Sequence, residues 1–222
     1  RSLVLSKNAA EVLRTLYHVQ TPVEVVYNAC RDLSRRSEVQ KKKIILVAGI
    51  LDSNKAYDII IKAFAKLASR YPEWKLVFAG VGELENARSI AASEGISEQV
   101  EFRGWVSGEA KETLFSQATI YCLASYKEGL PVSVLEAWSY ELPVVCTPAG
   151  GLVDVVQQGV NALVVQPGDI HQLAESLERL IKDPSLRDAI AANSHALVKD
   201  VFTQERMNRQ LEEIYRNSTR ND

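Results

Sequence analysis

Short apolar segments alternate with segments of helical period along the chain from residue 43 onward. The apolar segments are rich in β-branched residues and are apolar throughout, which is typical of strands buried on both faces of a sheet. The predicted strands are Ile44–Ala48, Lys75–Ala79, Val100–Arg103, Ile120–Ala124, Val144–Cys146 and Ala162–Val165. The segments between them predict helices over 55–70, 83–94, 109–117, 132–140, 151–158 and 169–181.

The helix predicted over 55–70 has the clearest pattern, because Ile60, Ala63, Phe64 and Leu67 follow the i, i+3, i+4, i+7 spacing of one helix face. Since a helix follows almost every strand, the pattern predicts a parallel sheet that helices cover on both faces. We therefore expect an α/β fold, a Rossmann-like doubly wound parallel sheet.

The two ends of the chain depart from this alternation. Residues 184–216 predict two extra C-terminal helices without a strand between them, opened by Asp183-Pro184 and by Thr203. Before residue 43, the pattern predicts a strand at Leu3–Leu5, a helix, and a second strand at Val23–Tyr27.

Composition and charge exclude several classes of protein. Of the 222 residues, 46% are hydrophobic and 24% are charged, as in a globular domain. The net charge is -2, so no overall basic field attracts nucleic acid or anionic lipid. The longest uncharged apolar runs, such as Ile44–Leu51, fall far short of the roughly 20 residues of a membrane span. The polar stretch Arg31–Lys43 has two interpretations, a solvated linker, which we favour, and a membrane-surface or phosphate patch.

Cysteine and histidine usage indicates a reducing compartment and no metal site. The three cysteines are an odd number without a Cys-x-x-Cys spacing, so we expect a cytoplasmic protein and inert core thiols at Cys122 and Cys146. The histidines are scattered without ligand spacing, and no Asp-x-Asp pair occurs. The remaining residues of these types are Cys30, His18, His171 and His195.

Glycines gather at the predicted carboxyl ends of the strands. Ligands of open parallel sheets bind beyond these ends. Glycine follows the strand at four of the first five ends, at Gly49, Gly80, Gly104 and Gly150. Because glycine lets the backbone turn sharply or approach a ligand closely, the sequence predicts a ligand crevice along this edge.

The loop before the helix predicted over 132–140 indicates what the crevice binds. Pro131 suits the first helical position, and the free N–H groups that follow form an anion site at the positive helix end. Glu128 precedes this helix, and Glu136 lies eight positions further on. Carboxylates beside an anion site suit a phosphate that also carries hydroxyl groups, which favours a nucleotide sugar. The alternative is that Glu136 is merely an exposed helix residue.

The segment from Glu128 to Ala137 resembles the E-x7-E signature of retaining glycosyltransferases of the GT-B fold, specifically glycosyltransferase family 4, the group 1 type. The resemblance covers about residues 23–216, in the order of the family's C-terminal, donor-binding domain. Leu3–Ser6 resembles the last strand of the family's N-terminal domain, and Asn28-Ala29-Cys30 resembles its interdomain linker. Further matching segments are Pro143-Val144-Val145, Gly150-Gly151, Gly159-Val160-Asn161 and Pro167-Gly168-Asp169.

The resemblance implies a division of the chain. Residues 1–22 would end a mostly missing N-terminal domain, 23–42 would be the linker, 43–200 the nucleotide-sugar-binding domain, and 201–222 a C-terminal helix and tail. The first residue is Arg1 rather than methionine, so we expect a piece of a longer enzyme. The missing domain would supply the acceptor site, and the full-length protein would work in bacterial polysaccharide biosynthesis, in the cytoplasm or peripherally at the inner face of the membrane.

The resemblance also implies roles in a site for a UDP- or GDP-linked sugar, without cofactor or metal. Glu136 would bind the ribose hydroxyls, and Lys55 would counter the charge that grows on the leaving diphosphate. Glu128 would hold the donor sugar with the backbone of Gly129 and Leu130. The diphosphate would lie against the N–H groups near Val132 and Ser133 and beside Gly49. The base would be bordered by Gly80, Gly82, Gly104, Trp105 and Val106.

One departure from the family's pattern bears on the function. Ile50 stands where the family has an arginine that grips the diphosphate, and Lys127 or Arg103 is a candidate substitute. Alanines also replace expected glycines, at Ala29, Ala56 and Ala162. The alternatives to a glycosyltransferase are therefore a degenerate nucleotide-binding module without transfer activity and, less favoured, a relative of nucleotide-sugar epimerases or glycogen phosphorylase.

Overall fold

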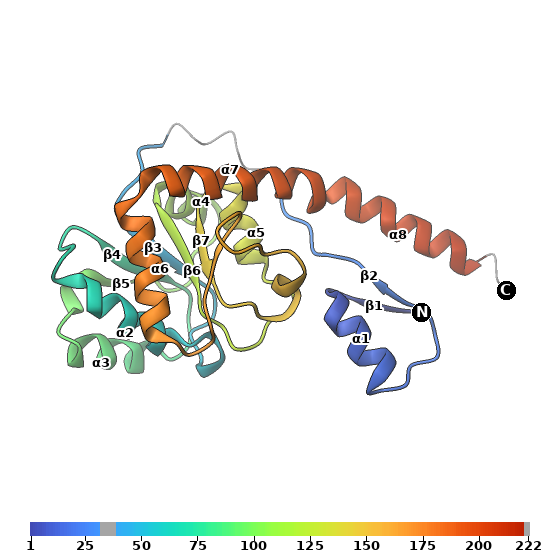
Figure 1. Ribbon diagram of the computed structural model, residues 1–222, viewed down its shortest axis with the longest axis horizontal. Coiled ribbons are helices and arrows are strands. Elements are labelled where there is room, and N and C mark those ends of the chain that lie inside the picture. The colour runs from blue at the N-terminus through green and yellow to red at the C-terminus, as the bar shows by residue number, and fades with distance from the viewer. Residues whose placement is uncertain (32–38, 220–222) are drawn as a thin grey trace.

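The computed structural model describes residues 1–31 and 39–219 of the chain. Its main sheet has six parallel strands in the order β5-β4-β3-β6-β7-β8, which is the order of a doubly wound Rossmann-type sheet (Figure 1). The expected α/β fold is confirmed. The strands are β3 (Ile44–Ala48), β4 (Lys75–Ala79), β5 (Val100–Phe102), β6 (Ile120–Leu123), β7 (Val144–Cys146) and β8 (Leu163–Val164).

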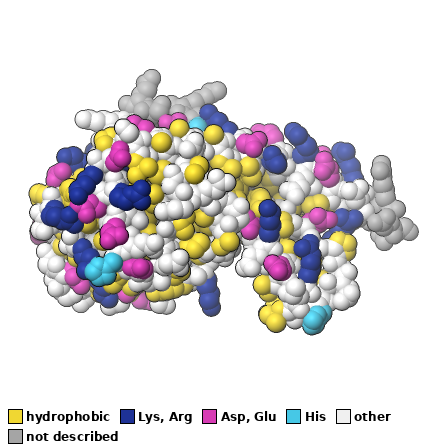
Figure 2. Space-filling view, viewed as in Figure 1, with side chains coloured by type: hydrophobic (Ala, Val, Ile, Leu, Met, Phe, Trp, Pro, Cys, Tyr) yellow, Lys and Arg dark blue, Asp and Glu magenta, His cyan; other side chains and the backbone are white. Residues whose placement is uncertain are grey.

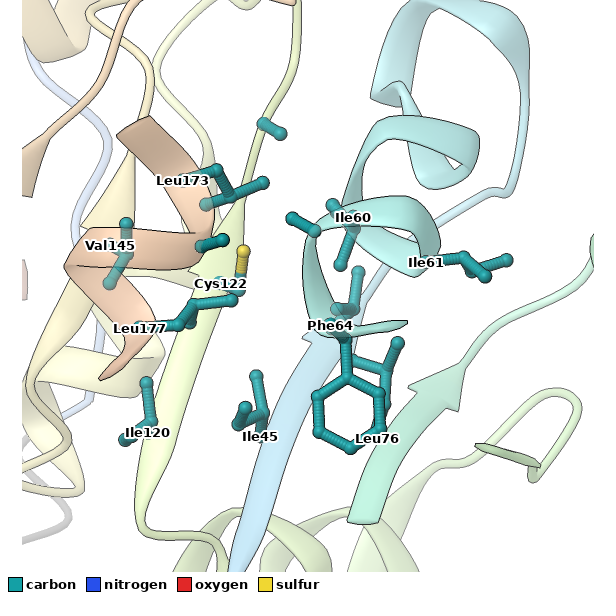
Figure 3. Packing of buried hydrophobic residues seen from close by; sticks show 14 of the residues in the cluster. Ile45, Ile60, Ile61, Phe64, Leu76, Ile120, Cys122, Val145, Leu173 and Leu177 are labelled. Atoms are coloured by element: carbon teal, nitrogen blue, oxygen red, sulfur yellow. The ribbon is translucent and has the colours of Figure 1, made fainter. Parts of the chain in front are cut away.

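Helices cover both faces of this sheet. Neighbouring residues of β3 point to opposite faces, so Ile45 packs under α2 and α6 while Leu46 packs under α4 and α5. Figure 3 shows Ile60 and Phe64 of α2 beside Ile45 and Leu76, with Leu173 and Leu177 of α6 over Cys122 and Val145. These helices are α2 (Tyr57–Ala68), α3 (Leu84–Ser93), α4 (Gly108–Gln117), α5 (Val132–Ser139) and α6 (Ile170–Lys182).

The two buried thiols belong to this core. Cys122 and Cys146 are fully buried on the neighbouring strands β6 and β7. Burial raises the pKa of the Cys146 thiol to about 12 and raises the pKa of Cys122 as well, so neither forms a thiolate at neutral pH. The expectation that they are inert core residues is confirmed.

The first 25 residues form a separate small unit. Strands β1 (Ser2–Val4) and β2 (Val23–Val25) pair in parallel, connected by helix α1 (Lys7–Thr15). Helix α7 (Pro184–Val201) packs against α5 and α6, and α8 (Gln204–Thr219) continues from it to the small unit (Figure 1). There the Gln210 side chain donates a hydrogen bond to the carbonyl of Val25 at 2.7 Å. Figure 2 shows the unit as a small lobe beside the main body.

One predicted helix is wrong, several predicted segments end one or two residues away from their observed bounds, and one segment lies partly outside the described residues. The helix predicted over 151–158 is wrong, because Gly150–Asp154 forms a short 3-10 helix and a loop follows. The Asn161 side chain accepts from the N–H of Gln157 and donates to the carbonyl of Val155, and these bonds replace a helical ladder. The helix predicted over 55–70 begins only at Tyr57. Of the polar stretch Arg31–Lys43, residues 32–38 lie outside the described residues.

The loops after β3 and β4 approach each other so closely that only glycine fits. A Cβ atom on Gly80 would lie 1.7 Å from the carbonyl oxygen of Gly49. Gly80→Ala should therefore lower the free energy of unfolding by about 3 kcal/mol, the upper end of the range for overpacking. Urea unfolding followed by circular dichroism measures the loss.

Gly104→Ala is the matched control for this substitution. Gly104 has a φ of +65°, but a Cβ there would meet nothing within 4 Å. Alanine should lower the free energy of unfolding only by the cost of a left-handed backbone conformation, about 1 kcal/mol. Equal losses in the two variants would show that the loop after β4 moves aside without cost.

Candidate functional site

A hollow of about 550 Å³ lies at the carboxyl ends of β3 and β4, facing the loop that leads from β6 into α5. It occupies the point where the strand order reverses, between β3 and β6, where ligands of doubly wound sheets bind. Most of the predicted site residues meet there. Those that line it are Gly49, Lys55, Gly80, Trp105, Val106, Glu128, Val132, Ser133 and Glu136.

Four predicted residues do not line the hollow. Gly82 and Gly104 lie further along their loops, and a left-handed φ of +125° and +65° explains why each is glycine. The carbonyl of Gly129 accepts from the N–H of Gly151, and the carbonyl of Leu130 accepts from the Asn28 side chain. The structure thus gives Gly129 and Leu130 a role in holding the loop. Their predicted contact with the donor sugar stays a prediction.

Lys55 reaches the hollow from a short 3-10 turn, Ser53–Lys55, that precedes α2. The Asp52 carboxylate caps this turn by accepting from the N–H of Lys55 at 2.9 Å. Ala56 follows with a φ of +50°, which turns the chain into α2 and suits the glycine that the family resemblance implies at this place. The Asn54 side chain donates to the carbonyl of Lys127 at 2.9 Å, so this turn is tied to the loop that carries Glu128.

The Lys55 ammonium and the Glu128 carboxylate form an ion pair, with Nζ 2.5 Å from Oε1. Glu128 retains only 10% of its side-chain exposure. A carboxylate buried to this extent is costly without a partner, so the pair holds both side chains at the edge of the hollow.

A second ion pair joins Lys111 of α4 to Glu136 of α5, with Nζ 2.6 Å from Oε1. The same ammonium lies 5.8 Å from the centre of the Phe115 ring, one helical turn further along α4. The sequence interpretation missed Lys111. Its signal was present, because α4 begins just after the loop of Trp105 and Val106 and places its first turn at the crevice.

The amino-terminal end of α5 also opens onto the hollow. The helix begins at Val132, directly after Pro131, and no side chain among the described residues caps it. Its first N–H groups and the helix dipole therefore present partial positive charge to whatever the hollow contains. This geometry suits an anion, as the sequence indicated.

Ile50 lines the hollow and is 56% exposed, so it is not packed in the core. Neither proposed substitute for the missing arginine lines the hollow. Arg103 instead pairs with Glu101 at 2.5 Å. The structure offers Lys111 as the second cation of the pocket.

The arrangement can bind a molecule that is both anionic and rich in hydroxyl groups. Lys55, Lys111 and the end of α5 supply positive charge, and Glu128 and Glu136 supply hydrogen-bond acceptors. The Trp105 ring stands 73% exposed at the border, where a planar base could stack on it. Within residues 1–31 and 39–219, no cluster of three or more His, Cys, Asp or Glu side chains is placed to hold a metal ion. Among those residues, no helix has the length and hydropathy to span a bilayer.

The chain is similar in sequence to known glycosyltransferases. An uncharacterized glycosyltransferase of Haemophilus influenzae is 32% identical over 164 residues, which are 72% of this chain and 45% of the relative. A Campylobacter jejuni N-acetyl-galactosaminyltransferase that acts on a diNAcBac-PP-undecaprenol-linked glycan is 29% identical over 183 residues, covering 80% of this chain and half of the relative. The chain thus spans about half the length of the curated relatives it matches.

The fold is shared with GT-B glycosyltransferases of known structure. The structure of Anabaena Alr3699/HepE in complex with UDP superposes with a TM-score of 0.86 at 20% identity, covering 97% of this chain and 63% of that one. The model of the family "Glycosyl transferases group 1" matches residues 31–197, which include every residue that lines the hollow. The chain belongs to the group 1 glycosyl transferases.

Proposed function

We propose that this chain is the donor-binding, C-terminal half of a retaining glycosyltransferase of family 4, and that its hollow binds a UDP- or GDP-linked sugar. The observation that carries the proposal is the meeting of two lysine–glutamate pairs with the uncapped end of α5 in one pocket. The UDP complex of Alr3699/HepE, which shares the fold, supports a nucleoside diphosphate as the ligand.

Each group has a part in this binding. The diphosphate lies against the N–H groups of Val132 and Ser133, with Lys55 beside it. Glu136, one helical turn further in, accepts hydrogen bonds from the ribose hydroxyls. Glu128, at the other edge, accepts hydrogen bonds from the donor sugar. The base lies by Gly80 and against the exposed ring of Trp105.

The reaction transfers the sugar with retention of its anomeric configuration. The bond from the anomeric carbon to the phosphate oxygen breaks, and a bond from an acceptor hydroxyl oxygen forms on the same face of the sugar while the hydroxyl proton passes to the leaving diphosphate. Negative charge grows on the leaving diphosphate as its bond breaks. Lys55 and the end of α5 stabilise this charge, which makes them the groups that lower the barrier. No metal is required in this scheme.

The small unit of residues 1–25 supports a division between two domains. A parallel two-stranded sheet is too small to be stable alone. Its exposed apolar side chains fit the edge of a larger domain that covers them. They are Leu3, Leu5, Val12, Leu16 and Tyr17.

We assign the acceptor site to that other domain, so this chain alone transfers no sugar. The acceptor is a glycan or a lipid-linked glycan of polysaccharide biosynthesis, which the undecaprenol-linked substrate of the Campylobacter relative supports. We therefore propose that the full-length enzyme works in the cytoplasm or peripherally at the inner face of the membrane.

Ile50 favours a second candidate function, a nucleotide-binding module that has lost transfer activity. A missing charge-assisted contact removes about 1.5–3 kcal/mol of diphosphate binding. A full-length protein that binds the sugar nucleotide without transferring or hydrolysing it would support this candidate.

Calorimetric titration of the chain with UDP, GDP and ADP tests the proposed function. One of them should bind, and Glu136→Ala should weaken that binding by about 2 kcal/mol, the scale of a hydrogen bond to a charged group. The 2′,3′-dideoxy analogue is the control, and the same substitution should leave its affinity unchanged or raise it, because Lys111 is released from its ion pair. If none of the three ligands binds, the proposed function is wrong. Equal losses for both forms would show that Glu136 does not act on the ribose.

Glu128→Ala separates the sugar subsite from the diphosphate subsite. Affinity for the correct sugar nucleotide should fall by about 2 kcal/mol, while affinity for the bare nucleoside diphosphate stays equal or rises, because Lys55 is released from its ion pair. In the full-length enzyme the same change should lower kcat, since the anomeric carbon is no longer positioned. An equal loss for the bare diphosphate would contradict the assignment.

Ile50→Arg should tighten binding of the nucleoside diphosphate by about 1–2 kcal/mol, below the full value of a charged contact because a long side chain must become ordered. The gain should shrink as salt is added, since the contact is partly exposed. Titrations at low and high ionic strength measure both effects. A gain that salt does not change would show that the arginine acts by packing rather than by charge.

A further inference from the structure

We propose that Lys111 is a cation that binds the donor diphosphate in the pocket where Ile50 supplies no charge. The inference rests on the proposed function, because it needs a diphosphate in the pocket.

The position of Lys111 puts its ammonium within reach of the anion site. Its Nζ lies 2.6 Å from the Glu136 carboxylate. Glu136 lies four residues into α5 from Val132, which is about 6 Å along a helix axis. A lysine side chain has four methylene groups with free rotation, so the ammonium can move this distance without a shift of the backbone.

The ion pair of Lys111 with Glu136 is weak enough for the ammonium to leave it and reach the diphosphate. The side chain is 35% exposed, and a partly exposed ion pair with a single carboxylate is weak. A diphosphate carries more negative charge than Glu136, so it competes successfully for the ammonium. When the ammonium shifts, both oxygens of Glu136 become available to the ribose hydroxyls.

The other cations near the crevice are accounted for. Lys55 pairs with Glu128. Arg103 pairs with Glu101. Among the described side chains that line the hollow, Lys55 and Lys111 are the ones with positive charge, and Lys111 alone projects from α4.

The test uses Lys111→Gln with Lys62→Gln as its matched control, because Lys62 is paired with Asp58 on α2 and does not line the hollow. Each variant is titrated with the tightest binder among UDP, GDP and ADP and with the corresponding nucleoside. Lys111→Gln should weaken the diphosphate about tenfold, the value of one charge-assisted contact, and leave the nucleoside unchanged or tighter. Lys62→Gln should change neither.

A second pair of variants separates a direct contact from a structural effect on Glu136. Lys111→Arg should keep most of the affinity, since it keeps the charge. In the Ile50→Arg background, Lys111→Gln should cost less than threefold, because the new arginine supplies the missing cation. Thermal unfolding of each variant confirms that the fold is kept.

The outcomes distinguish this inference from the proposed function. If the unsubstituted chain binds no nucleoside diphosphate, the proposed function fails and the role of Lys111 with it. If it binds one, but Lys111→Gln weakens the diphosphate no more than Lys62→Gln does, the role of Lys111 alone is wrong. Equal losses for diphosphate and nucleoside, or no rescue by Ile50→Arg, would also overturn it, by showing that Lys111 only positions Glu136.

Discussion

The pairing of β3 with both β4 and β6 is the constraint on which the rest of the structure depends. The chain reverses its direction of winding at this strand, so the loops that follow β3 and β6 lead into helices on opposite faces of the sheet. They diverge and leave a gap over the carboxyl edge. The loop after β4 closes one side of that gap, and the contact of Gly80 with Gly49 fixes how near it comes.

The balance of charge inside this gap is close to neutral. The side chains of Asp52, Glu128 and Glu136 face those of Lys55 and Lys111. The excess of one carboxylate is offset by the end of α5, equivalent to roughly half a positive charge. On the proposed function, an anion would not enter a preformed basic site but would exchange partners with the two ion pairs, and this exchange would free the carboxylates for hydroxyl groups. Such a pocket would favour a ligand that carries both kinds of group over a simple phosphate.

Much of the fold and part of the site follow from the sequence alone. Strands such as Ile44–Ala48 are buried on both faces, so all their residues are apolar, and this pattern can be recognised in the sequence. Glu128 and Glu136 are found because their spacing lies within one loop and helix. Lys111 could not be predicted, because it lies 25 residues before Glu136 on another helix, and the two residues meet only in the folded chain. The error over 151–158 has a similar origin, since the Asn161 side chain that replaces the helix follows that segment.

The three tryptophans differ in their exposure to solvent, so the intrinsic fluorescence of one of them can report on the pocket. Trp74 and Trp138 are buried at 4% and 0% exposure, whereas Trp105 stands at the border of the hollow. A collisional quencher such as acrylamide reaches only the last of these rings. The accessible, red-shifted part of the intrinsic emission therefore comes from the pocket itself, and a ligand that covers Trp105 shields that part selectively. The occupancy of the hollow can be followed in the unlabelled chain without any substitution.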